Sequence, residues 1–152
     1  MTGEPLELEF TVECSPEHAF STWTERIDRW WPKGHSVSSD PDLAVVIEPR
    51  LGGRIFERTP SGDEHDWGEV TTWEPPRAFG YLWHLAQDRS DATDVEIRFD
   101  PDGERTRVTI QHAGWERLGA RAEDLRGRNR KGWAGVIPLY ERACRGEGAQ
   151  AR

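Results

Sequence analysis

Residues 93–112 read TDVEIRFDPDGERTRVTIQH, and this stretch decides the fold class. In its first half apolar and polar residues alternate, with Val95, Ile97 and Phe99 on one side and Asp94, Glu96 and Arg98 on the other. After the turn signal DPDG at 100–103 the alternation resumes, with Val108, Ile110 and His112 on the apolar side. A period of two predicts a pair of antiparallel strands joined by a turn, with one face in water and the other covered.

A helix near the C-terminus is predicted to cover that face. Residues from about 121 to 144 place six apolar side chains at helical spacing: Leu125, Trp133, Val136, Ile137, Tyr140 and Ala143. Gly127, Gly132, Gly135 and Pro138 lie within the same segment, although each interior glycine costs about 1 kcal/mol relative to alanine. Either the small residues leave open volume for a guest molecule beside Trp133, or they reflect close packing on the sheet and a kink at Pro138.

The upstream chain reads as further strands and one short helix. Period-two alternation predicts a strand at 6–14, and Ser15 followed by Pro16 predicts a helix start, with the helix ending at Trp30-Trp31-Pro32. Strands follow at 43–48, at 54–59, over about ten residues ending near Trp73, and at 78–85. This order is a meander without βαβ units. We therefore predict one α+β domain over residues 6–144 and a frayed tail over 145–152.

Size and charge exclude several classes of function. The chain has 152 residues and a formal net charge of −8, so its surface repels phosphate backbones and nucleic acid is not an expected partner. No apolar run is long enough to span a membrane, and the start MTGEPLELEF does not look like a signal peptide. We expect a cytoplasmic protein in which Cys14 and Cys144 are reduced, and edge strands that could pair into a homodimer.

Aromatic residues supply the candidate binding site, because eight Trp are present. They either fill the core or line a pocket on the concave side of the sheet. His112 shares parity with Val108 and Ile110, close to Trp115, and is the best candidate for a polar anchor, although a lone histidine on an apolar face is usually a core residue. The predicted ligand-binding residues are Trp23, Trp31, Tyr81, Trp83, His112, Trp115 and Trp133.

Nothing in the sequence indicates catalysis or metal binding. There is no GxSxG motif, neither cysteine has an adjacent base, and Gly52-Gly53 lies in a turn between strands. No histidine pair has the HxxxH or HxH spacing of metal sites, so we expect no catalytic residue, metal or cofactor. Most carboxylates fall on the solvent side, but parity alone does not settle whether Glu57 and Glu69 point inward.

Four segments resemble a known superfamily: FSTWTERIDRWWP (20–32), PRLGGRIFER (49–58), WGEVTTWEPPRAFGYLWH (67–84) and KGWAGVIPLYERAC (131–144). Together they are similar to the START-like (helix-grip, SRPBCC, Bet v 1-like) superfamily, in particular to activators of the heat-shock-protein-90 ATPase. The resemblance covers residues 6–144. It implies a curved antiparallel sheet of six or seven strands around a long C-terminal helix, two short helices after the first strand, and a deep cavity between sheet and helix.

The sequence and the resemblance leave three possible functions. The first, which we favour, is binding of a small hydrophobic or aromatic molecule in the cavity. The second is an enzyme of the cyclase or aromatase kind, in which a polar group such as His112 moves protons. The third is stimulation of a chaperone ATPase, but the true activators use an additional N-terminal domain, and only about five residues precede the first predicted strand.

Overall fold

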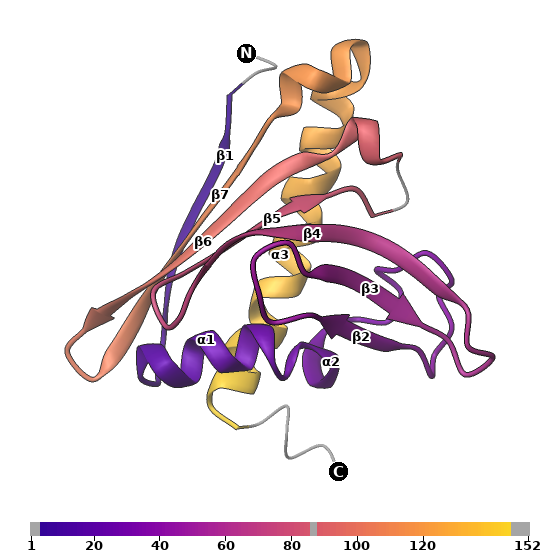
Figure 1. The fold of residues 1–152 in the computed structure, drawn as a ribbon. Coiled ribbons are helices and arrows are strands. Elements are labelled where there is room, and N and C mark those ends of the chain that lie inside the picture. Colours follow the sequence, from indigo (N-terminus) through magenta and orange to yellow (C-terminus); the bar gives the residue numbers. More distant parts are fainter. Residues whose placement is uncertain (1–3, 86–87, 147–152) are drawn as a thin grey trace.

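A computed structural model describes residues 4–85 and 88–146 of the chain. Seven antiparallel strands form one sheet in the order β1-β7-β6-β5-β4-β3-β2. They are β1 (Leu6–Val12), β2 (Ala44–Ile47), β3 (Arg54–Arg58), β4 (Glu64–Glu74), β5 (Ala78–Trp83), β6 (Thr93–Asp102) and β7 (Arg105–Ala113). The long helix α3 (Ala122–Cys144) lies behind the curved sheet (Figure 1). This is the predicted helix-grip fold.

The hairpin of β6 and β7 has the predicted faces. Val95 pairs with His112, Ile97 with Ile110 and Phe99 with Val108, and all six side chains are buried. The strand β6 continues to Asp102, so the turn lies at Gly103 and Glu104 instead of at the predicted 100–103. Gly103 has a φ of 66°, a left-handed conformation that glycine adopts without strain. The hairpin is therefore longer than predicted, but it buries the predicted face.

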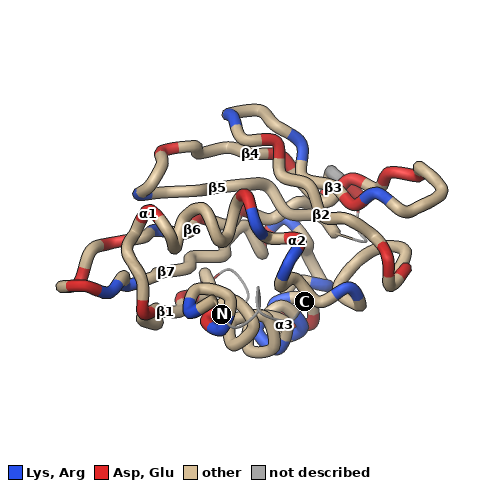
Figure 2. Tube along the Cα trace, turned by 90° about the horizontal axis from the view of Figure 1, so that it is seen from below, with Lys and Arg blue, Asp and Glu red and all other residues tan. Residues whose placement is uncertain are grey.

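Two short helices follow β1, as the resemblance implies. The first, α1 (Pro16–Thr24), begins where predicted, because the Ser15 hydroxyl accepts a hydrogen bond from the His18 backbone N–H at 3.2 Å. The second, α2 (Ile27–Trp30), ends before Pro32. Seen from below, the strands from β4 to β1 follow a curve, and α1 and α2 lie on the same side of the sheet as α3 (Figure 2).

The end of α3 packs against the chain just after β1. Cys14 and Cys144 are free, and their thiols hydrogen-bond to each other. This hydrogen bond lowers the pKa of Cys14 and, together with burial, raises the pKa of Cys144. The predicted tail at 145–152 falls mostly outside the described residues, which end at Gly146.

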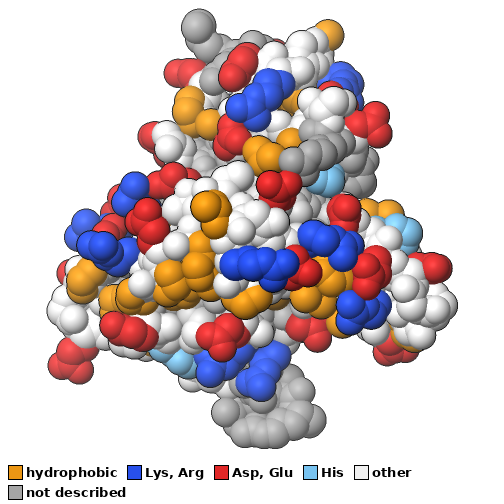
Figure 3. All heavy atoms as spheres, in the orientation of Figure 1, with side chains coloured by type: hydrophobic (Ala, Val, Ile, Leu, Met, Phe, Trp, Pro, Cys, Tyr) orange, Lys and Arg blue, Asp and Glu red, His pale blue; other side chains and the backbone are white. Residues whose placement is uncertain are grey.

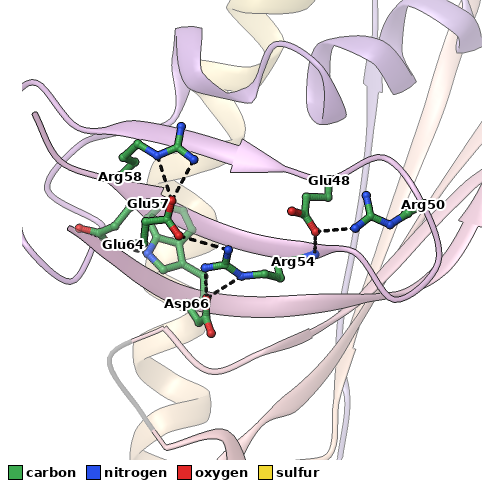
Figure 4. Close-up of polar contacts among 8 residues, drawn as sticks. Glu48, Arg50, Arg54, Glu57, Arg58, Glu64 and Asp66 are labelled. Carbon is green, nitrogen blue, oxygen red and sulfur yellow. Dashed lines mark hydrogen bonds and ion pairs between the residues drawn. The ribbon is translucent and has the colours of Figure 1, made fainter. Parts of the chain in front are cut away.

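The outer face of β3 and β4 is stabilised by ion pairs. Arg54 binds Asp66 at 2.7 Å and Glu64 at 3.2 Å, and Arg58 binds Glu64 at 2.9 Å (Figure 4). The two guanidinium groups lie over the Phe56 ring, at 4.1 and 5.3 Å from its centroid, and leave it only 2% exposed. In the view of Figure 3, charged side chains of both signs are mixed with hydrophobic ones.

Candidate functional site: a half-filled space under the sheet

Aromatic side chains fill the space between the sheet and α3 at the end covered by α1 and α2. The Trp23 ring lies 4.5 Å from the Tyr140 ring and 5.1 Å from the Trp30 ring, measured between centroids. Phe20 adds edge contacts to Phe79 and Phe99 at 6.5 and 5.3 Å. The Tyr140 hydroxyl donates a hydrogen bond to the Ala19 carbonyl at 2.7 Å, which ties α3 to α1. This end is closed.

The other end of the same space contains a cavity of about 420 Å³. It lies between the first half of α3, the 3₁₀ segment η2 (Trp115–Arg121), the chain after β5, the start of β6 and the loop after α2. Its wall is mainly apolar: Trp31, Trp83, Leu85, Trp115, Leu118, Leu125, Trp133 and Val136. Polar side chains and glycines complete it: Gly34, His35, Ser36, His84, Asp91, Thr93, Arg128, Asn129 and Gly132. The volume falls within the range of small-molecule sites.

Four of the seven predicted site residues line this cavity: Trp31, Trp83, Trp115 and Trp133. The other three are placed elsewhere. Trp23 belongs to the filled end, with its ring 6.1 Å from the Trp133 ring. Tyr81 is buried in the core between Phe79 and Trp83, at 5.0 and 5.6 Å between ring centroids. His112 is fully buried and does not line the cavity.

The ring of His112 is held on both nitrogens. Trp133 Nε1 donates to His112 Nδ1 at 3.1 Å, and His112 Nε2 lies 2.7 Å from Thr93 Oγ1. Because an indole N–H can only donate, Nδ1 must accept, and the neutral ring carries its proton on Nε2 and donates it to Thr93. The Thr93 hydroxyl then donates to the Trp83 carbonyl at 3.4 Å. No ring nitrogen of His112 is left for a ligand.

Burial also keeps His112 neutral. The side chain is fully buried, and this desolvation lowers its pKa from 6.5 to about 3. The Trp115 ring packs against the His112 ring, with centroids 4.3 Å apart and the planes tilted by 40°, and its Nε1 donates to the His112 carbonyl at 2.9 Å. His112 therefore holds three wall residues in place, namely Thr93, Trp115 and Trp133, instead of acting as the polar anchor predicted from the sequence.

The loop that forms the rim of the cavity is anchored by Glu57. This carboxylate is fully buried and accepts hydrogen bonds from the backbone N–H groups of Val37 and Ser38, at 2.6 and 2.9 Å, and from Trp67 Nε1 at 2.7 Å. Burial by itself would raise the pKa of Glu57, but the hydrogen bonds from Ser38, Val37 and Trp67 lower it below 4.5. Figure 4 shows Glu57 on β3. The ionised Glu57 carboxylate therefore holds the loop next to Ser36 in place through these hydrogen bonds.

Gly132 faces the cavity from α3. A Cβ atom added at Gly132 would meet no atom within 4 Å, and the residue lines the cavity. Gly127 and Gly135 also have open space around an added Cβ, but both are exposed and neither is part of the wall. Of the two interpretations of the glycine-bearing helix, open volume beside Trp133 applies at Gly132.

Sequence reasoning missed further wall residues, among them His84 and Thr93. His84 follows directly after β5, where the chain leaves the sheet, so Trp83, His84 and Leu85 all reach the cavity despite their alternating parity. Thr93 is the first residue of β6. It was missed because the predicted wall residues were chosen mainly for their aromatic side chains. The signal that could have found His84 is its position at the end of an aromatic strand.

A curved sheet that grips a C-terminal helix, with a cavity between them, defines the helix-grip class. A family model described as "Activator of Hsp90 ATPase homolog 1-like protein" matches residues 13–137, and the chain belongs to this family. No curated protein matches the chain. Within the described residues, no helix is long and apolar enough to cross a membrane, and no group of three or more His, Cys, Asp or Glu is placed to hold a metal ion.

Several solved structures are similar to this chain. CalC from Micromonospora echinospora, described as a self-sacrificing resistance protein, has 25% identity, a TM-score of 0.72 and coverage of 98% of this chain and 99% of that chain. Txn09, described as an anthrahydroquino-gamma-pyrone synthase, has 29% identity, a TM-score of 0.60 and coverage of 83% and 87%. Protein PFC0360w, an HSP90 activator from Plasmodium falciparum, has 17% identity, a TM-score of 0.67 and coverage of 95% and 97%, and supports the fold alone.

Proposed function

We propose that the protein binds a small hydrophobic or aromatic molecule in the cavity between the sheet, η2 and the first half of α3. The observation that carries this proposal is the cavity of about 420 Å³ with four Trp side chains in its wall. Burying a planar molecule against indole surfaces is favourable by about 25 cal/mol for each Å² of apolar area removed from water. The hydrogen bonds of His112 and Glu57 hold the wall and the rim in place, which lowers the ordering cost of binding.

Native mass spectrometry of freshly purified protein tests the proposal. We expect a co-purifying small molecule or, for the apo protein, a rise in melting temperature with members of a library of aromatic compounds. The matched variants are Gly132→Leu, which places a side chain in the cavity, and Gly135→Leu, which adds the same side chain on the exposed side of α3. Binding should be lost in Gly132→Leu and retained in Gly135→Leu. An apo mass together with an unchanged melting temperature across the library would contradict the proposal.

The similarity to a synthase at 29% identity favours a second candidate, an enzyme of the cyclase kind that uses the same cavity. His112 is a poor proton carrier for such a reaction, since both ring nitrogens are engaged and the pKa is lowered to about 3. Mass spectrometry of the bound compound before and after incubation separates the two candidates. A carrier returns the compound unchanged, whereas an enzyme releases a product of different mass or retention time.

A further inference from the structure

The imidazole of a buried histidine in the cavity wall has no hydrogen-bond partner among the described residues. His84 is 7% exposed, and its backbone N–H donates to the Trp67 carbonyl at 2.8 Å. In contrast, no hydrogen bond to the imidazole is found among the described residues. Within residues 4–85 and 88–146, Thr22 Oγ1 is the one fully buried side-chain N or O atom that lacks a hydrogen-bond partner. The ring nitrogens of His84 also lack a partner, so they are not fully buried and a small molecule can contact them. Since His84 lines the cavity, a bound molecule can reach them.

The indole N–H groups in the wall point to a second such position. Trp31 Nε1 donates to the His35 carbonyl at 2.8 Å, and the N–H groups of Trp115 and Trp133 both bind His112. These three rings therefore present carbon surface to the cavity. The Trp83 indole differs, because no partner for its N–H is found in the described part of the chain. Trp83 and His84 are adjacent in sequence and both line the cavity, and neither side chain has a hydrogen-bond partner among the described residues.

Most of the remaining polar wall groups are engaged with protein partners or exposed to solvent. Ser36 Oγ donates to the Lys33 carbonyl at 2.7 Å, and the Thr93 hydroxyl is bound to His112. Asp91 forms an ion pair with Arg121 at 2.8 Å. Arg128 is 72% exposed and lies 3.5 Å from Asp124. Trp83 and His84 are therefore available for hydrogen bonding to a ligand, and the other Trp side chains of the wall are available for apolar contact.

On the basis of the proposed function, we infer that the ligand is a planar aromatic molecule carrying a ring hydroxyl, and that this oxygen is bound by His84 and Trp83. The hydroxyl donates to the accessible imidazole nitrogen and accepts from the Trp83 indole N–H. The aromatic rings lie against the indole faces of Trp115 and Trp133. The ligand hydroxyl gives the imidazole a hydrogen-bond partner inside the cavity.

Two probes of equal shape test the inference, 2-naphthol and 2-methylnaphthalene, which differ in a hydroxyl and a methyl group. Isothermal titration calorimetry measures the affinity of each for the full-length protein. We expect 2-naphthol to bind about tenfold more tightly than 2-methylnaphthalene, a difference of about 1.4 kcal/mol, because its hydroxyl forms hydrogen bonds that a methyl group cannot form. Equal affinities for the two probes would overturn the inference while leaving the proposed function intact. Binding of neither probe would argue against the proposed function itself.

Three variants assign the preference to residues. His84→Phe removes the imidazole nitrogens but keeps a ring, and Trp83→Phe removes the indole N–H. His18→Phe changes a half-buried histidine of α1 that does not line the cavity and serves as the control. We expect His84→Phe to abolish the preference for 2-naphthol, Trp83→Phe to reduce it, and His18→Phe to retain it. A preference that survives in both His84→Phe and Trp83→Phe would overturn the assignment, and thermal unfolding of each variant confirms that it is folded.

Discussion

The two ends of the space under the sheet contain the same kind of side chain but are packed differently. At the filled end, Trp23, Trp30 and Tyr140 contact one another with ring centroids 4.5–5.2 Å apart. At the hollow end, Trp83, Trp115 and Trp133 surround a cavity of about 420 Å³. A high Trp content therefore does not decide by itself whether such a fold is solid or open.

The difference follows from what covers each end. Helices α1 and α2 contribute Phe20, Trp23 and Trp30 to the filled end, and all three side chains are buried. The hollow end is covered by the short segment η2 and a loop, and α3 presents Gly132 there. In addition, hydrogen bonds hold the wall indoles of Trp115 and Trp133 back against His112, so they do not collapse into the space.

The largest expected effect is a difference between the two ends in the unfolding free energy that is lost when a Trp side chain is removed. Trp23→Ala should lower the free energy of unfolding by about 3–5 kcal/mol, because it opens a cavity in a closely packed cluster. Trp83→Ala should cost about 1–2 kcal/mol, since that side chain is partly exposed and already borders open space. Urea unfolding monitored by circular dichroism measures both. Equal losses would show that the two ends are packed alike.

The next effect tests the hydrogen bonds to Glu57 at the rim of the hollow end. Glu57→Gln should lower the free energy of unfolding by about 2–3 kcal/mol at pH 7, because it replaces a buried carboxylate that accepts three hydrogen bonds. Glu13→Gln, at an exposed pair 3.6 Å from Arg105, should cost less than about 0.5 kcal/mol.

The same hydrogen bonds to the Glu57 carboxylate predict a pH dependence of the free energy of unfolding. Since the pKa of Glu57 is lower in the folded state than its ordinary value of 4.5, the carboxylate stabilises the fold above that pH. This contribution is lost as the pH falls through 4.5 and then through the folded-state pKa. The difference between wild type and Glu57→Gln should therefore shrink in acid, and a difference that is constant from pH 7 to pH 3 would contradict the role of the ionised carboxylate.

A smaller effect concerns the hydrogen bonds behind the wall. Burial lowers the pKa of His112 to about 3, so below pH 6.5 the unfolded chain takes up a proton that the folded protein excludes. Between pH 6 and pH 5, wild type should lose about 1.2 kcal/mol of unfolding free energy more than His112→Gln does. Chemical denaturation at several pH values provides the measurement. Parallel pH profiles for the two proteins would mean that His112 is protonated in the fold.

The smallest effect compares two glycines of α3. Gly132→Ala and Gly135→Ala should each raise the free energy of unfolding by up to about 1 kcal/mol, because neither added Cβ meets another atom and alanine favours the helix. Thermal unfolding of both variants checks this. A destabilising Gly132→Ala would indicate close packing at that position and would argue against open volume beside Trp133.

Much of the fold could be predicted from the sequence, because burial follows simple periods. The alternation at Val95, Ile97 and Phe99 gave the correct face of β6, and the Ser15-Pro16 signal gave the start of α1. Helix α3 formed over the predicted range despite its three glycines and Pro138. The hydrophobic stripe that it buries against the sheet outweighs their low helix propensity.

The site was less predictable, because its chemistry depends on hydrogen bonds between distant segments. Parity placed His112 on the inner face, but only the approach of Thr93 and Trp133 determines that its nitrogens are occupied. Likewise, the inward direction of Glu57 depends on a loop about twenty residues earlier, as the contacts with Val37 and Ser38 show. His84 was missed because parity arguments stop where β5 ends.

The most direct test of a hollow end beside a filled one is a crystal structure of the protein soaked with 6-bromo-2-naphthol. Anomalous scattering locates the bromine without reference to the rest of the map. We predict a single strong peak between Trp83, Trp115 and Trp133, with the hydroxyl at His84 and no peak near Trp23 and Tyr140. A structure in which indole rings close that space, with no bromine peak inside it, would contradict the account.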